Sequence, residues 1–274
     1  MTNLTLAKHQ GLGNDFLVLL DLDGSSPIDA ALTRSLCDRH RGIGADGLIR
    51  VTVGSGGLGF ELRNADGSPA EMSGNGMRCL AQAALDAGLV EAGVSFMVAT
   101  PAGPRTVIIR PGDAPTQAWV TVEMGTATVE GDGERCNVGA GHLRVNMGNP
   151  HLVVLGPDPS VVAVESLGPA LEAGIAGGQN VEFVALGPGP DEITMRVWER
   201  GVGETLACGT GACAAAVALF HWGRVGRRVT VHQRGGDADV ELRADGTIVL
   251  AGPTERIAVC VVERAVVAAA GGRA

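Results

Sequence analysis

Two short motifs place a residue capable of acid/base chemistry directly before a Gly-x-Gly sequence. They are Ser73-Gly74-Asn75-Gly76 and Cys208-Gly209-Thr210-Gly211. The segments that follow, 75–88 and 210–222, are the strongest helix candidates, since the first ends on a glycine and the second is rich in alanine. A glycine pair that opens a helix leaves backbone N–H groups available at the positive end of the helix dipole. Each motif is therefore a candidate anion site.

The two residues before the glycines differ in acidity. A helix N-terminus is expected to lower the pKa of the Cys208 thiol, which would make it a competent base or nucleophile near neutral pH. Ser73 carries a hydroxyl, a much weaker acid that needs a neighbouring base. Two plainer interpretations stay open: Cys208 as a buried packing residue, and each glycine motif as a tight strand-to-helix turn. Neither motif matches the nucleotide-binding glycine loops.

An internal repeat relates the two motifs. Ser73 and Cys208 are 135 residues apart (208 − 73 = 135), and the same shift carries GNDFLV at 13–18 onto GNPHLV at 148–153. It also carries Asn64 onto Glu199, each after a segment of alternating apolar residues. Inverting a carbon requires one group that removes a proton and a second group on the opposite face that returns one. A duplicated scaffold supplies that pair.

The surrounding pattern predicts strands in greater number than helices. Strand-like runs lie at 47–53, 58–63, 105–110, 117–124 and 257–262. We expect an α+β fold of two pseudo-symmetric domains, each a curved sheet or barrel around a central helix, with the active site in the cleft between them. The halves are 1–130 and 131–274, joined near 129–142, with the end of the chain able to cross back. A single mixed α/β domain is the alternative.

Composition narrows the class of protein. The 274 residues carry a net charge of −9, which disfavours nucleic-acid binding because phosphate contacts need clustered Lys and Arg. The first 16 residues lack the features of a secretory signal, and no apolar run approaches the roughly 20 residues that span a membrane. The six cysteines match no zinc-binding spacing. We expect a soluble, cytoplasmic protein with reduced cysteines, no metal and no membrane contact.

Six motifs in order resemble those of the diaminopimelate epimerase family, over essentially the whole chain. They are GLGNDF (11–16), GADGLI (44–49), NADGS (64–68), SGNGMRC (73–79), MGNPH (147–151) and ERGVGETLACGTGACAA (199–215). The resemblance implies an isomerase without pyridoxal phosphate or metal that interconverts LL- and meso-diaminopimelate for lysine and peptidoglycan synthesis. It also implies a small amino-acid substrate and a homodimer.

The family's functional residues carry over position by position. Cys208 matches one of its two catalytic cysteines, and the other falls on Ser73. His151 and Glu199 resemble the residues that tune the two acid/base groups. The implied substrate contacts are Asn14, Asn64, Gly74, Asn75, Asn149, Asn180, Glu199, Arg200, Gly209 and Thr210. For each asparagine a turn residue is the alternative, for Arg200 a surface ion pair, and for His151 a buried structural histidine.

Two departures from the family pattern bear on activity. Gly47 follows Asp46 where many relatives have glutamine, and Ser73 replaces a cysteine. Ser73 fits a natural variant with a helping base, an engineered substitution, or a related isomerase; Cys79 is the nearest thiol that could replace the base. The leading hypothesis is two-base epimerisation of diaminopimelate. The others are a racemase or dehydratase of another amino acid, and an inactive relative that binds substrate.

Overall fold

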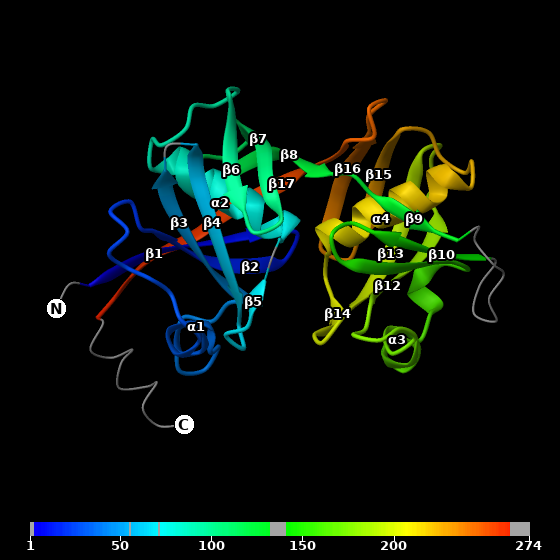
Figure 1. Cartoon of the computed structure of the whole chain (residues 1–274), viewed down its shortest axis with the longest axis horizontal. Helices are drawn as coiled ribbons and strands as arrows, with labels where there is room; N and C mark the ends of the chain where they lie inside the picture. The colour runs from blue at the N-terminus through cyan, green and yellow to red at the C-terminus, as the bar shows by residue number, and fades with distance from the viewer. Residues whose placement is uncertain (1–2, 55, 71, 132–140, 264–274) are drawn as a thin grey trace. The chain divides into compact units, whose positions relative to one another are not determined.

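The computed structural model describes residues 3–54, 56–70, 72–131 and 141–263. The chain forms two compact units (Figure 1). Unit 1 contains the described residues up to Val122 and those from Pro253 onward, and unit 2 contains the described residues of Glu123–Gly252. Strand β17 (Ile248–Val262) runs from unit 2 into unit 1. Residues 132–140 of the predicted junction lie outside the described residues.

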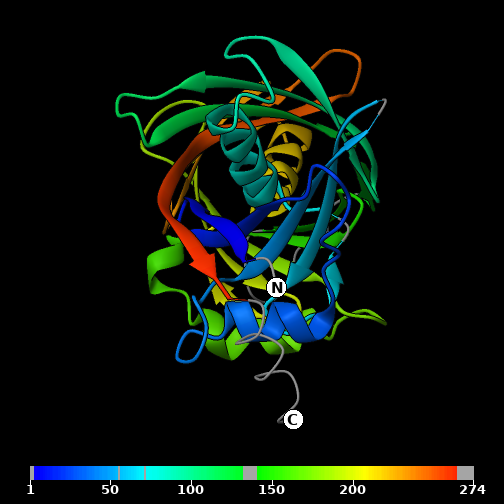
Figure 2. The same ribbon diagram turned by 90° about the vertical axis from the view of Figure 1, so that its left-hand side faces the viewer.

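Unit 1 is a closed barrel around one helix. Strand pairs β1–β2, β3–β4, β6–β7 and β7–β8 are antiparallel, whereas β2–β3 and β4–β6 are parallel. Strand β17 pairs with both β1 and β8 and closes the ring, inside which helix α2 lies (Figure 2). The elements are β1 (Leu4–Gly11), β2 (Asn14–Leu20), α1 (Ala30–Cys37), β3 (Gly47–Gly54), β4 (Gly57–Asn64), β5 (Pro69–Ala70), α2 (Gly74–Asp86), β6 (Ser95–Thr100), β7 (Gly103–Pro111) and β8 (Gln117–Gly125).

Unit 2 repeats this plan. Its strands pair in the order β9, β10, β11, β12, β13, β15, β16, β17, with β11–β12 and β13–β15 parallel. Helix α4 packs against β10, β11, β12, β13, β15 and β16. The elements are β9 (Thr128–Glu130), β10 (Gly141–Asn146), β11 (Pro150–Leu155), the short 3₁₀ helix η1 (Pro159–Val161), α3 (Val164–Glu172), β12 (Asn180–Leu186), β13 (Glu192–Glu199), β14 (Gly203–Thr205), α4 (Gly209–His221), β15 (Arg228–Gln233) and β16 (Gly236–Leu242).

The two central helices are buried on every side over most of their length. In α2 every residue from Gly74 to Ala84 is buried, and in α4 every residue from Gly209 to Leu219. A helix that is buried all round needs small or apolar residues on all of its faces, which explains the alanine content of α4. Strands β2 and β11 are buried over consecutive residues because both of their faces are covered.

The duplication is visible in the strand register. Phe16 lies opposite Gly47 in the parallel pair β2–β3, and His151 lies opposite Asn180 in β11–β12. Gly13 and Gly148, related by the 135-residue shift, both have positive φ (83° and 99°), a conformation that glycine adopts at no steric cost. The predicted α+β fold with two pseudo-symmetric halves is confirmed. Within the described ranges, no helix is long and apolar enough to cross a bilayer.

Candidate active site

Ser73 and Cys208 are the N-cap residues of the two central helices. Both have extended backbones, with φ and ψ of −142° and 120° for Ser73 and −125° and 118° for Cys208. The Ser73 Oγ accepts a hydrogen bond from the Gly76 N–H at 3.0 Å, and the Cys208 Sγ accepts one from the Gly211 N–H at 3.3 Å. The sequence therefore predicted correctly that a helix follows each of these residues. Each helix begins one residue earlier than predicted, at Gly74 and Gly209 rather than at 75 and 210.

The surroundings of Cys208 overturn the expected acidity of its thiol. Burial raises the pKa of Cys208 well above its usual range, and the charges of Glu199 and Glu182 raise it further. Hydrogen bonds from Thr210 and the Gly211 amide act in the opposite direction but are outweighed. The prediction of a lowered pKa is wrong, because only 6% of Cys208 is exposed and two carboxylates lie nearby. At neutral pH Cys208 is a thiol, the proton-donating form.

A chain of polar side chains leads from Cys208 into the core of unit 2. The Cys208 Sγ lies 3.4 Å from the Thr210 Oγ1, which accepts from the Asn149 Nδ2 at 3.4 Å. The Asn149 Oδ1 lies 3.0 Å from the His151 Nε2, and the His151 Nδ1 lies 2.6 Å from the Glu182 Oε1. The structure thus brings three predicted residues, Asn149, His151 and Thr210, together with Cys208.

Glu182 is a site residue that the sequence motifs did not predict. The shift that replaces Phe16 by His151 makes one core position polar, and a buried imidazole needs hydrogen-bond partners. The only charged residue in β12 is Glu182, in the middle of the run NVEFVAL. This single charge in an otherwise apolar strand is the sequence feature that could have identified Glu182.

Asn180, Glu199 and Arg200 lie together at the ends of β12 and β13. The Asn180 Oδ1 accepts from the Arg200 backbone N–H at 2.9 Å, and its Nδ2 donates to the Pro150 carbonyl at 3.3 Å. Glu199 accepts from the Thr205 hydroxyl at 2.5 Å. The exposed Arg200 guanidinium donates to the Gly177 carbonyl at 3.3 Å, a contact that a negatively charged ligand could replace.

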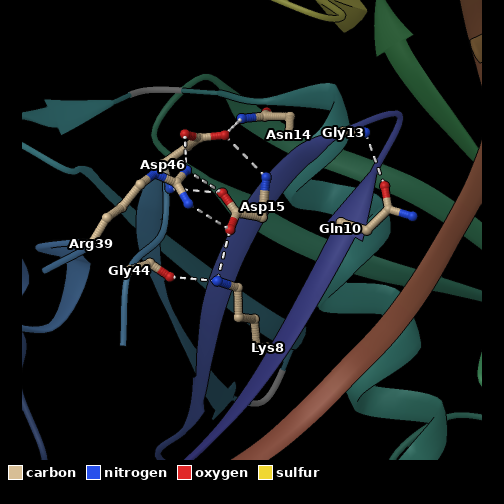
Figure 3. Close-up of polar contacts among 8 residues, drawn as sticks. All are labelled: Lys8, Gln10, Gly13, Asn14, Asp15, Arg39, Gly44 and Asp46. Atoms are coloured by element: carbon tan, nitrogen blue, oxygen red, sulfur yellow. Dashed lines mark hydrogen bonds and ion pairs between the residues drawn. The ribbon is translucent and has the colours of Figure 1, made fainter. Parts of the chain in front are cut away.

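In unit 1 a charged network fixes the side chain of Asn14 (Figure 3). The Asn14 Nδ2 donates to the Asp46 Oδ2 at 2.7 Å, and its Oδ1 accepts from the Asn75 Nδ2 at 3.2 Å. The Arg39 guanidinium bridges Asp46 and Asp15, each at 2.7 Å. Asn14 is therefore held between the start of α2 and an ion-paired carboxylate.

The network continues to Lys8, whose Nζ lies 2.9 Å from the Asp15 Oδ2 and donates to the Gly44 carbonyl at 2.7 Å. Burial of Asp15 by itself raises its pKa, but hydrogen bonds from Arg39 and Lys8, together with their charges, outweigh burial and lower it. Asp15 is therefore ionised at neutral pH and keeps Arg39 in place. Asp15 and Asp46 both lie in motifs that the sequence analysis identified, but their role in supporting Asn14 was not predicted.

Two further predicted residues of unit 1 occupy different settings. Asn64 ends β4, opposite Gly47 of β3, and its Nδ2 donates to the Ser68 Oγ at 3.1 Å, so it also stabilises the turn at 64–68. Cys79 lies inside α2, fully buried, and burial raises the pKa of its thiol to about 12. Its Sγ lies 3.8 Å from the Thr254 Oγ1. These surroundings argue against Cys79 as a substitute base.

No group of three or more His, Cys, Asp or Glu side chains that could hold a metal ion occurs in the described part of the chain.

Comparison with known proteins places the chain. The diaminopimelate epimerase family model matches residues 6–130 and 143–257. The diaminopimelate epimerase of Synechococcus elongatus is 39% identical over 279 residues, which cover 93% of this chain and 96% of that protein. The chain belongs to the diaminopimelate epimerase family. The family match covers both N-cap motifs, so Ser73 stands at a position inside the matched region.

Solved structures agree on the fold at lower sequence identity. A phenazine biosynthesis protein of the PhzF family from Bacillus anthracis superposes with a TM-score of 0.74 at 14% identity, covering 96% of this chain and 100% of that one. A hydroxyproline epimerase from Agrobacterium vitis, with bound trans-4-hydroxy-L-proline, superposes with a TM-score of 0.72 at 18% identity, covering 95% and 92%. The diaminopimelate epimerase family thus shares its duplicated architecture with these proteins.

Proposed function

We propose that the chain is an isomerase that interconverts LL- and meso-diaminopimelate by removing the α-proton from one face of the carbon and returning a proton to the other. One observation carries the proposal. In a member of the diaminopimelate epimerase family, two equivalent central helices each begin at an N-cap residue with an exchangeable proton, Ser73 and Cys208. In this proposal the two residues act on opposite faces of one substrate carbon.

The helix N-termini supply the electrostatic part of the mechanism. Loss of the α-proton places negative charge on the substrate carboxylate, which the amides of Gly74, Asn75, Gly209 and Thr210 would stabilise. Cys208, protonated at neutral pH, delivers a proton to the carbon; in the reverse direction its thiolate removes one. On the opposite face Ser73 needs a base that accepts its hydroxyl proton, since its hydroxyl alone is too weak an acid and its alkoxide too scarce.

The remaining substrate contacts suit a ligand with two amino-acid ends. Amide groups of Asn14, Asn64, Asn149 and Asn180 serve its carboxylates and ammonium groups. Glu199 binds ammonium, and Arg200 binds the distal carboxylate. Glu199 and His151 also adjust the two acid/base groups. In this proposal the reaction uses neither pyridoxal phosphate nor metal, so dialysis against a chelator leaves the rate unchanged.

We further propose a cytoplasmic homodimer. The support is an apolar stripe on one face of β17, where Ile257, Val259 and Val261 are 53%, 60% and 65% exposed. Val259 and Val261 are alternate residues and share one face, and Ile257 lies beside them at a register shift against β1, so the three exposed side chains offer a surface that a second copy could cover.

Deuterium incorporation tests the proposed reaction. Incubation with LL-diaminopimelate in heavy water, followed by proton NMR, should show loss of the α-proton signal. Cys208→Ala should abolish exchange, whereas Cys213→Ala, which removes another buried thiol of α4, should not. Exchange that appears only after Ser73→Cys would identify an engineered or inactive relative. No exchange from either form would refute the proposal.

A second candidate is a racemase or dehydratase of another amino acid. Ser73 favours it, because a serine and cysteine pair departs from the family's two cysteines, and the hydroxyproline epimerase has the same fold. Tight binding of a proline derivative, with no binding of diaminopimelate, would decide for this candidate. Tight binding of diaminopimelate without exchange in the unmodified chain would instead indicate an inactive binding relative.

A further inference from the structure

The core of unit 2 contains a carboxylate and an imidazole that are completely buried. Glu182 and His151 are both 0% exposed, and their Oε1 and Nδ1 atoms are 2.6 Å apart. The second carboxylate oxygen, Oε2, is buried with no hydrogen-bond partner among the described residues. Burying a carboxylate with one oxygen unsatisfied is unfavourable, so this pair is not explained by packing alone.

The internal repeat provides a direct comparison. Val18 lies opposite Ile49 in β2–β3, and the equivalent Val153 lies opposite Glu182 in β11–β12, so Ile49 and Glu182 are equivalent positions. Phe16 is likewise equivalent to His151. In unit 1 both positions are apolar and buried. An apolar pair at these positions is therefore compatible with the fold, and of the two units only the one that contains Cys208 has the polar pair.

The polar pair also lies directly against the start of the Cys208 helix. A Cβ placed on Gly211 would be 2.8 Å from the Glu182 Oε1, and a Cβ on the equivalent Gly76 would be 3.2 Å from the Ile49 Cδ1. Glu182 thus occupies the space beneath the first turn of α4 that Ile49 occupies beneath α2.

The hydrogen bonds from Glu182 to Cys208 form one continuous chain with two consistent arrangements. In the first, both ring nitrogens of His151 donate, to Glu182 and to the Asn149 carbonyl oxygen, the Asn149 amide donates to Thr210, and the Thr210 hydroxyl donates to the Cys208 thiolate. In the second, the His151 Nε2 accepts from a reversed Asn149 amide, the Thr210 hydroxyl donates to the Asn149 carbonyl oxygen, and the Cys208 thiol donates to Thr210. The arrangement at one end of the chain therefore fixes the arrangement at the other.

We propose that Glu182 is a positioning residue of the active site: by anchoring His151 it orients Asn149 and Thr210, so that the Thr210 hydroxyl can donate to the thiolate of Cys208 during proton transfer. This inference deepens the proposed epimerase function and depends on it for its kinetic consequence. Glu182 does not touch the sulfur and takes no proton from the substrate. It acts through the three side chains between them.

Glu182 can change the pKa of Cys208 in two opposite directions, one as a nearby charge and the other as a positioning residue. The carboxylates of Glu182 and Glu199 both oppose formation of the thiolate, so removing the Glu182 charge would by itself make Cys208 more acidic. Loss of the Thr210 donor would make Cys208 less acidic. If positioning dominates, Glu182→Gln raises the pH at which Cys208 titrates; if only the charge matters, that pH falls.

A double-mutant cycle between Glu182→Gln and Thr210→Val separates the two effects. We expect Glu182→Gln to lower the kcat for deuterium exchange about 100-fold with little change in KM, since misplacement of a positioned group has losses of that order. In the Thr210→Val background the same substitution should change kcat by less than about 3-fold. Glu182→Asp should restore part of the rate. Additive effects of the two substitutions would overturn the proposal.

A measurement without turnover keeps this test separate from the proposed function. The ultraviolet absorbance of the thiolate is followed against pH, and the Cys208→Ala curve is subtracted to isolate Cys208. Glu182→Gln should move the Cys208 titration to higher pH. Glu192→Gln, which breaks a partly exposed His–Glu pair of the same unit with His232, is the matched control and should leave it unchanged. A shift to lower pH, or none, would overturn the proposal even if the chain exchanges no proton.

A second variant covers the case in which Glu182→Gln does not fold. The double substitution His151→Phe with Glu182→Ile copies the apolar pair of unit 1. In that background Thr210→Val should no longer move the Cys208 titration, because Thr210 has lost its anchor. A shift as large as Thr210→Val produces in the unmodified chain would overturn the proposal.

Discussion

The two helix-start glycines give a matched pair of substitutions with different expected consequences. An alanine at Gly211 would bring its Cβ to 2.8 Å from the Glu182 Oε1 and 3.3 Å from the Cys208 Sγ. The carboxylate is fixed on that side by its 2.6 Å contact with the buried His151. At Gly76 the contact with the N-cap residue is similar, with the Ser73 Cβ at 3.2 Å, but the other neighbour is the Ile49 Cδ1 at 3.2 Å, the free end of a flexible side chain. Gly211→Ala must therefore displace a polar anchor, and Gly76→Ala only a methyl group.

The magnitude follows from the contacts that are lost. Leaving a buried carboxylate without its partner costs about 3–5 kcal/mol, and replacing glycine by alanine in a helix returns at most about 1 kcal/mol. We expect Gly211→Ala to lower the free energy of unfolding by about 2–4 kcal/mol, and Gly76→Ala to change it by no more than about 1 kcal/mol. For a chain of this size, 3 kcal/mol corresponds to a fall of about 6–12 °C in Tm.

Thermal unfolding followed by circular dichroism at pH 7 compares the two variants with the unmodified chain. Near-UV spectra recorded before heating verify that each variant is folded. Equal Tm values for Gly211→Ala and Gly76→Ala would refute the reasoning, because they would mean that Glu182 is not held against the first turn of α4.

Burial lowers the pKa of His9 to about 4, so the stability associated with neutral His9 is complete above pH 6.5 and is lost as the pH falls toward 4. In urea unfolding, His9→Gln should make the fall in unfolding free energy over this range smaller by about 3 kcal/mol. An unchanged pH dependence would contradict this. Asp46→Ala should raise the KM for diaminopimelate about 10-fold with a smaller effect on kcat, because Asn14 loses its acceptor; an unchanged KM would exclude a binding role for that contact. Val259→Glu should convert a dimer to a monomer in light scattering, with Val161→Glu at an exposed valine of the 3₁₀ helix η1 as control, and a persistent dimer would place the interface elsewhere.

The helices, the strands and the duplication could be predicted because their signals are local. Glycine pairs, alanine-rich runs and apolar alternation each fix a backbone conformation over a few residues, and the constant shift of 135 residues connects the halves. Ser73 and Cys208 could be placed at helix N-termini for the same reason. The positive φ angles of Gly13 and Gly148 are likewise a local feature, which the residue type makes possible.

The acidity of Cys208 could not be predicted in this way. A helix start by itself favours the thiolate, but the sign of the pKa shift depends on the depth of burial and on Glu199 and Glu182, which come from two different strands. The role of Glu182 depends in turn on strand register, which places it beneath Gly211. The support of Asn14 by Asp46 and Arg39 also depends on contacts between segments that are far apart in the sequence.

The most direct test of the account is the interconversion of the two diastereomers by chains that differ at position 208. LL-Diaminopimelate is incubated with the unmodified chain or with Cys208→Ala, and the meso product is measured by chiral chromatography. Loss of a group that transfers a proton in the transition state should slow formation of the meso isomer by about 10²–10⁴-fold. Equal rates of meso formation by the two chains would contradict the assignment of Cys208 as one of the two acid/base groups.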